Sequence, residues 1–185
     1  MDAIDVLRGF ARNSAWANHR LYAACAKLPP HDLNATRTSF FPTILKTLNH
    51  NALVDAYYLD ALTGGGRGRK VFDQGPEPFS ELAPLRDAQR RVDRELIVFV
   101  ENLKGDGALD VETKIARRDH VQVERTGEVL LHLFQHQIHH RGQVHAMLAG
   151  TQVAPPPLDE FFLGEELALQ QLRQRELEEL GLPLT

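Results

Sequence analysis

The histidine-rich segment of this chain reads Leu130-Leu-His-Leu-Phe-Gln-His-Gln-Ile-His-His-Arg-Gly-Gln-Val-His-Ala-Met-Leu148 and holds five of the nine histidines. A helix turns by about 100° per residue, so it would place six side chains of this region on one stripe: Val129, Leu133, His136, His140, Gln143 and Met147. His136 and His140 are four residues apart on that stripe. Both imidazoles would therefore project from adjacent turns toward one metal ion.

The remaining faces of the same segment are largely apolar, with the side chains of Leu130, Leu131, Phe134, Ile138, Val144 and Leu148. We expect a helix that is apolar nearly all round to be enclosed by other helices, which puts its histidines inside the protein. A buried imidazole needs a hydrogen-bond partner or a metal, because leaving it unpaired costs about 1–3 kcal/mol. These residues favour a metal site, and the alternatives are a hydrogen-bonded core cluster and an exposed histidine-rich face.

The length and composition are those of an ordinary soluble globular protein, and 185 residues suit one domain with a sizeable core. The net charge is −4 and no basic run or stripe is present, which disfavours nucleic-acid binding. The N-terminus carries Asp2 and Asp5 where a signal peptide would be basic, and no apolar run reaches membrane-spanning length. We therefore predict a cytoplasmic protein with no nucleic-acid or membrane partner.

Cys25 is the only cysteine, which excludes an internal disulfide and a cysteine-rich zinc site. It could be a nucleophile, but Leu21, Tyr22 and Leu28 share its apolar stripe. The pattern therefore predicts an inert thiol in the core.

Helical periodicity predicts five helices, over residues 3–28, 40–62, 80 or 84–103, 127–149 and 159–180. Ser39 is the expected N-cap of the second helix, Thr126 that of the fourth, and Gly164 marks a break in the last. Alternating polar and apolar residues at 111–116 and 120–125 predict a small β-hairpin. The glycine-rich segment 64–68 follows a helix instead of a strand, so we expect a loop and not a phosphate cradle. The last helix carries charges on its stripe and should pack outside the bundle or against a second subunit.

Four long helices with a fifth at the end predict a helix bundle, in which cofactor and metal sites form from side chains on facing helices. His50 lies in the predicted second helix and is the natural third partner of His136 and His140. A lone histidine on such a helix is usually structural, so this grouping depends on the bundle. Asn18 is a polar residue on the apolar stripe of the first helix, and it is either a buried hydrogen-bonding group or part of a site lining.

Four stretches make the chain similar to a known family: Ala15-Trp-Ala-Asn18, Lys46-Thr-Leu-Asn-His50, Leu131-His-Leu-Phe-Gln-His-Gln-Ile-His-His-Arg-Gly-Gln-Val144 and Pro155-Pro-Pro-Leu-Asp159. They resemble the DinB-like (DinB/YfiT) superfamily of small bacterial metal-binding four-helix-bundle proteins, over nearly the whole chain. The resemblance implies an all-α fold in a single domain over residues 1–185. This domain would have an up-down four-helix bundle at 1–150, a short hairpin before the fourth helix, and an extra C-terminal helix in an extension at 151–185. The family commonly has Asn before the first histidine of the pair, where this chain has Gln135.

The resemblance also implies a metal triad formed by His50, His136 and His140. Three neutral imidazoles leave a coordination position open, and Zn²⁺ or Ni²⁺ suits such a nitrogen set. Three further residues are candidates for orienting the ligands from a second layer: His139, Gln143 and Asn18. No catalytic residue is expected beyond the metal ligands.

Characterised members of the family look like thiol-dependent transferases, in which a metal-bound low-molecular-weight thiol attacks an electrophile as its thiolate. The resemblance therefore implies a thiol S-transferase whose partners are a small-molecule thiol and an electrophile. One alternative is a hydrolase that uses metal-bound hydroxide, and another is a non-catalytic metal-binding stress-response protein. Family members are often homodimers, so we expect a homodimer.

Overall fold

The computed structural model describes residues 1–163 and 167–182, and most of these residues are helical. Its elements follow in the order α1 (Ala3–Cys25), α2 (Pro30–Leu33), α3 (Ile44–Thr63), the 3₁₀ helix η1 (Gly68–Phe72), α4 (Leu82–Glu101), the 3₁₀ helix η2 (Asp106–Leu109), β1 (Glu112–Ala116), β2 (Val121–Arg125), α5 (Thr126–Ala149) and α6 (Leu167–Glu179). None of the helices in these two ranges combines the length and the apolar character that crossing a membrane requires. The predicted helical fold is confirmed.

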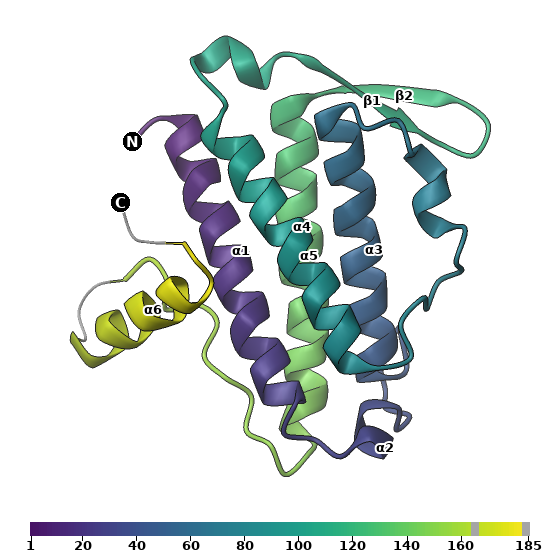
Figure 1. The fold of residues 1–185 in the computed structure, drawn as a ribbon, viewed down its shortest axis with the longest axis vertical. Coiled ribbons are helices and arrows are strands. Elements are labelled where there is room, and N and C mark those ends of the chain that lie inside the picture. The colour runs from purple at the N-terminus through teal and green to yellow at the C-terminus, as the bar shows by residue number, and fades with distance from the viewer. Residues whose placement is uncertain (164–166, 183–185) are drawn as a thin grey trace.

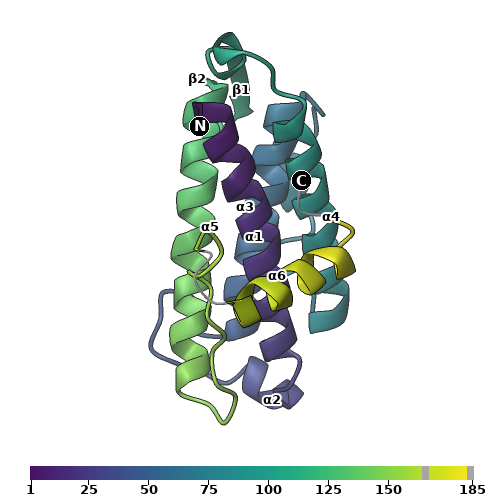
Figure 2. The same cartoon turned by 90° about the vertical axis from the view of Figure 1, so that its left-hand side faces the viewer.

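Four of the helices, α1, α3, α4 and α5, form a bundle in which each packs against two others (Figures 1 and 2). Their directions do not alternate as in the predicted up-down arrangement, because α3 runs parallel to α4 and α1 runs parallel to α5 (Figure 1). The cause is the segment 64–81, which contains η1 and carries the chain back along the bundle before α4 begins. The histidine-bearing α5 therefore packs against α3 on one side and α1 on the other.

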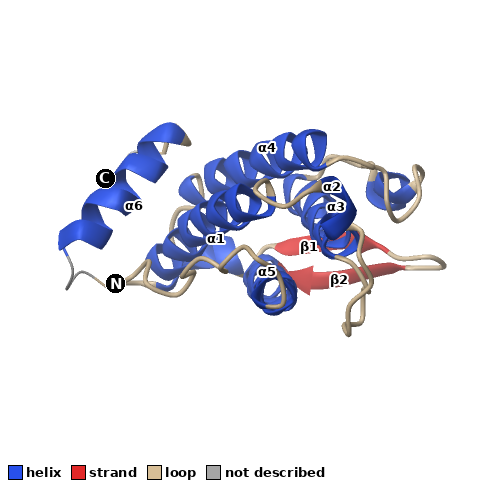
Figure 3. Cartoon of the chain, turned by 90° about the horizontal axis from the view of Figure 1, so that it is seen from below, coloured by secondary structure: helices blue, strands red, loops and turns tan. Residues whose placement is uncertain are grey.

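The predicted β-hairpin is present directly before α5. β1 and β2 pair antiparallel, with Glu112 opposite Arg125 and Ala116 opposite Val121. The Tyr57 hydroxyl of α3 donates a hydrogen bond to the Ala116 carbonyl, and Figure 3 shows the hairpin beside α3 and α5. Because α5 begins at the residue after β2 ends, the hairpin fixes where the histidine helix starts.

Two predicted helix caps are wrong. α3 begins at Ile44 instead of residue 40, and its cap is Thr43, whose hydroxyl accepts a hydrogen bond from the Lys46 amide at 3.1 Å. The later start follows from Pro42, because a proline disfavours helical geometry at the residue before it. Thr126 is the first residue of α5, and the N-cap of this helix is the preceding residue, Arg125.

α6 packs on α1, outside the bundle, which is one of the two positions predicted for it (Figure 2). Leu177 is 1% exposed and belongs to an apolar cluster with Trp16 and Phe161. The Trp16 indole N–H also donates to the Glu176 carboxylate at 2.7 Å. α6 begins at Leu167, later than predicted, and the expected break near Gly164 lies outside the described residues.

One side of α5 is open to solvent. Leu131 is 54% exposed and Ile138 is 48% exposed, and His132 and His139 are exposed as well. The prediction that this helix is enclosed on all sides, with all its histidines inside, is therefore wrong. Each helix of a four-helix bundle contacts two neighbours and keeps an outward face, even where that face carries leucine or isoleucine.

Cys25 lies at the end of α1 and is completely buried among apolar side chains. Burial raises the pKa of its thiol to about 12, because the charged thiolate loses its hydration there. The thiol is thus protonated and inaccessible, as predicted for a core residue.

Candidate metal centre

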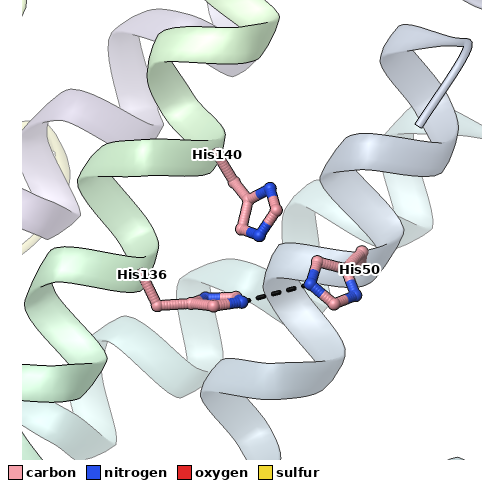
Figure 4. A group of neighbouring side chains, drawn as sticks. All are labelled: His50, His136 and His140. Atoms are coloured by element: carbon pink, nitrogen blue, oxygen red, sulfur yellow. Dashed lines mark hydrogen bonds between the residues drawn. The ribbon is translucent and has the colours of Figure 1, made fainter. Parts of the chain in front are cut away.

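Three histidines from two helices meet between α3 and α5 (Figure 4). His50 lies in the second turn of α3, whereas His136 and His140 lie in successive turns of α5. The Nε2 atoms of His50 and His136 are 3.1 Å apart, and one ring nitrogen from each of the three histidines lies within 4.8 Å of the other two. The structure thus brings together the three residues that were predicted as ligands.

The residues that follow the two α5 histidines explain why the imidazoles face α3. Gln137 and Arg141 are buried in the bundle, with exposed fractions of 0% and 4%. Successive side chains on a helix are about 100° apart, so burying these two residues on the α1 side turns His136 and His140 toward α3. The spacing of four residues then places both rings on one face.

Phe41 covers one side of the cluster. Its ring centroid lies 4.3 Å from that of His50 and 5.7 Å from that of His140. Phe41 belongs to the segment before α3, in which Pro42 delays the start of the helix. The side chain that shields two histidines therefore comes from a stretch that was predicted to be helical.

Burial keeps the three imidazoles neutral. It lowers the pKa of His50 to about 4 and that of His136 to about 3, and neighbouring histidines add to the effect on both. Burial also lowers the pKa of His140, against a hydrogen bond from Gln143 that raises it. Since a metal binds the neutral form of imidazole, all three lone pairs are available near neutral pH.

Gln143 orients one of these rings. Its Oε1 atom lies 2.8 Å from Nδ1 of His140, so the imidazole that donates from Nδ1 keeps Nε2 free as a ligand atom. Its Nε2 atom lies 3.1 Å from Nε2 of the exposed His139. Gln143 and His139, both candidates from the sequence, thus form a chain of contacts that ends at His140.

The hydrogen bonding of His136 differs from that of a structural core histidine. Its Nδ1 atom is buried and has no hydrogen-bond partner in the described part of the chain, while its Nε2 atom faces Nε2 of His50. A hydrogen-bonded core cluster would give each buried ring nitrogen a partner, because an unpaired polar atom is costly. Three neutral imidazole nitrogens are instead the donor set that suits a borderline divalent cation such as Zn²⁺. The three histidines could therefore form a metal site.

Asn18 contacts other buried polar residues and not the histidine cluster. Its side-chain nitrogen donates to both carboxylate oxygens of Asp93, at 3.0 and 3.2 Å, and its oxygen accepts from Arg141 at 3.4 Å. These are the contacts of a buried hydrogen-bonding group, and none of them reaches a histidine of the cluster.

Sequence reasoning missed His132, which lies one turn before His136 on α5. The centroids of these two rings are 6.3 Å apart, and the His132 ring also lies 5.0 Å from that of Tyr58. The same four-residue spacing that pointed to His136 and His140 could have identified it.

Two cavities are lined by neighbours of the cluster, although none of the three histidines lines either one. One has a volume of about 490 Å³ and is lined by Gln143 together with Arg37 and Phe40. The other has a volume of about 270 Å³, and its lining includes His132 and Arg117. Cavities of this size hold a small molecule or part of one.

Comparisons with known proteins agree with the family resemblance and with the fold. A sequence model described as the DinB family matches residues 5–174. Protein DinB of Bacillus subtilis (strain 168) is 24% identical over 151 residues, which is 79% of this chain and 86% of that protein. A crystal structure of a DinB-like protein from Bacillus cereus matches the fold with a TM-score of 0.60 at 15% identity, over 80% of this chain and 94% of that one. The chain belongs to the DinB family.

Proposed function

We propose that this chain is a metal-dependent transferase that activates a low-molecular-weight thiol for attack on an electrophile. The observation that carries the proposal is the group of three neutral imidazoles, from His50, His136 and His140, around one point. A site with three protein ligands leaves a position for a water or substrate, which is typical of catalytic metal centres and not of closed structural ones. The metal is Zn²⁺ or Ni²⁺ in this proposal.

A bound divalent ion would favour the deprotonated, nucleophilic form of a coordinated thiol. The residues of the chain then have separate tasks. The three histidines hold the ion, Gln143 keeps His140 in the tautomer that presents Nε2, and Phe41 keeps water from one side of His50. No nucleophilic side chain is required, because the thiol brings its own sulfur, and the proton that the thiol loses would pass to solvent water.

Two cavities near the cluster would give room for two substrates. One is lined by Gln143, which contacts His140, and the other by His132, which lies one turn before His136. A transferase must hold a thiol and an electrophile at the same time, whereas a hydrolase needs a site for one organic substrate and a water. The larger cavity has Arg37 as its one charged lining residue, so it suits a polar or anionic group.

The test begins with the metal content of protein purified without a histidine tag, measured by mass spectrometry, for the wild type and for His136→Ala. We expect about one metal per chain in the wild type and none in the variant, with the helical content unchanged. His132→Ala is the matched control, because this histidine is exposed and lies one turn away. Full occupancy in His136→Ala would disprove the ligand assignment.

Thiol activation is tested on the Co²⁺-substituted protein. Titration with several small thiols should change the visible absorption spectrum as sulfur enters the coordination sphere. If the protein binds Co²⁺ but shows no spectral change with any thiol, the metal site is supported and the transferase proposal is contradicted.

Two further parts of the proposal concern the state of the protein in the cell. We place it in the cytoplasm, which cell fractionation would check. We also expect a homodimer, and the exposed Leu131 and Ile138 on α5 support self-association through an apolar surface. Light scattering during gel filtration measures the oligomeric state.

A further inference from the structure

A polar network fills the interior of the bundle next to the histidine cluster. It joins α1, α3, α4 and α5 through side chains that are at most 4% exposed: Ser14, Asn18, Asp55, Gln89, Asp93, Gln137 and Arg141. Hydrogen bonds between buried side chains rigidify the elements that they connect. Within the described part of the chain, three atoms of this network have no such partner: Oδ1 of Asp55, Oε1 of Gln89 and Nε2 of Gln137. The position of this network relative to the ligands suggests what it holds in place.

On α5 the network uses the two residues that follow the ligands in sequence. The Ser14 hydroxyl of α1 donates to Oε1 of Gln137 and accepts from Nη1 of Arg141 at 3.0 Å. The same Nη1 atom approaches Oδ1 of Asn18 at 3.4 Å. Both ligand-bearing turns of α5 are thus attached to α1 by the residue next to the histidine.

On α3 the network uses Asp55, which follows His50 by five residues. Nε2 of Gln89 donates to Asp55 at 2.8 Å and to Asp93 at 2.9 Å, which links α3 with α4. Asn18 of α1 completes the connection to α5, because its side chain donates to Asp93 at 3.0 Å and accepts from Arg141 at 3.4 Å. The network therefore connects the part of α3 that carries one ligand with the turns of α5 that carry the other two.

The ligand geometry is sensitive to the rotation of α5. A side chain reaches about 6 Å from the helix axis, so a rotation of about 20° displaces its end by about 2 Å. Zn–N bonds are themselves only about 2.0–2.1 Å long, so such a rotation would take His136 and His140 out of reach of an ion held by His50. Apolar packing alone tolerates small rotations better than a set of directional hydrogen bonds does.

We propose that Arg141 and Gln137 are positioning residues, which fix the rotation of α5 through the buried network so that the three histidines converge on one ion. This inference rests on the proposed metal site and adds the residues that set its geometry.

The test compares Ser14→Ala and Arg141→Met with the control Leu96→Ala. Ser14→Ala removes the hydroxyl that holds both positioning residues and leaves every charge in place, so it should fold even if Arg141→Met does not. Leu96 is 1% exposed on α4, a helix without a ligand, and its truncation destabilises the bundle outside the network.

We expect Ser14→Ala to weaken Co²⁺ binding about 10-fold and to change the visible spectrum, as loss of a supporting residue does at other metal sites. Leu96→Ala should lower the unfolding midpoint and leave affinity and spectrum unchanged.

A measurement on metal-free protein separates this inference from the proposed function. The rings of His50 and His136 are close enough for a nuclear Overhauser effect between their protons. This signal should weaken in Ser14→Ala and persist in Leu96→Ala. If it persists in Ser14→Ala with unchanged Co²⁺ affinity, the network does not position the histidines. If the signal behaves as expected and the wild type binds no metal, the positioning stands and the proposed function fails.

Discussion

Asp55→Asn is expected to change how the stability of this protein depends on pH. Asp55 is fully buried, and burial raises the pKa of its carboxyl from the ordinary 3.8 to about 7, with the nearby Asp93 adding to the rise. The hydrogen bond from Gln89 and the charge of Arg141 act in the opposite direction and do not compensate for the lost hydration. The folded protein therefore holds a proton on Asp55 that the unfolded chain releases at a much lower pH.

The sign of the effect follows from this difference. The folded-state pKa lies above the unfolded-state value, so protonated Asp55 stabilises the fold at low pH, and this contribution is lost as the pH rises from about 4 through 7. The difference between 3.8 and about 7 corresponds to about 4 kcal/mol, at about 1.36 kcal/mol per pH unit. Asparagine has the shape of the protonated carboxyl and cannot ionise. The free energy of unfolding of the variant therefore does not fall in this way as the pH rises.

The assay is urea unfolding of wild type and Asp55→Asn at several pH values between 4 and 8, with a chelator present. We expect the stability of the variant, relative to the wild type, to increase by about 4 kcal/mol across this range, because the contributions of groups that do not interact with Asp55 cancel in the difference. In an Asp93→Asn background the increase should be smaller, since one cause of the raised pKa is gone. A difference that stays flat from pH 4 to 8 would refute the reasoning, because Asp55 would then ionise as easily in the fold as in the unfolded chain.

Three further outcomes are expected. Gln143→Leu removes the hydrogen-bond acceptor of a ligand histidine, so Zn²⁺ binding should weaken roughly 10–100-fold in a competition titration with a chromophoric chelator, while helicity is unchanged. Metal binding should persist at about pH 5, because the pKa values of His50 and His136 are lowered to about 4 and 3, and a Co²⁺ titration in acid that fails near pH 6.5 would contradict this. Leu130→Ala empties a fully buried position in the core and should cost about 2–5 kcal/mol of unfolding free energy in urea.

The elements and the pairing of two histidines were predictable because they depend on local patterns. Apolar residues at the helical period identified the four bundle helices, polar and apolar alternation identified the hairpin, and a spacing of four residues identified His136 and His140 as candidate ligands. His50 was grouped with them only through the predicted bundle and the family resemblance, since one histidine in an amphipathic helix carries no pattern of its own. Helix direction was not predictable, because it depends on the path of the segment 64–81 and no residue of that segment marks where it leads.

The buried network escaped prediction for a different physical reason. Asp55, Gln89 and Asp93 are polar residues of a kind that is usually exposed, and each becomes tolerable inside the protein only through partners on other helices. In the sequence of one helix, such a residue only interrupts the apolar stripe, and its partners on the other helices cannot be identified. Only Asn18 drew notice, because the apolar residues around it in sequence made the exception visible.

The network and the metal site together explain the composition of α5. His136-Gln137 and His140-Arg141 are two pairs of the same kind, separated by four residues, in which the first member faces α3 and the second faces α1. Because the two members of a pair are about 100° apart on the helix and the pairs repeat after about one turn, each set stays on its own face. A helix that carried only the histidines would have an apolar α1 face, free to shift or rotate by small amounts. Each histidine of α5 is followed by a hydrogen-bonding residue. When α5 is rotated so that Gln137 and Arg141 are buried against α1, His136 and His140 therefore point toward His50.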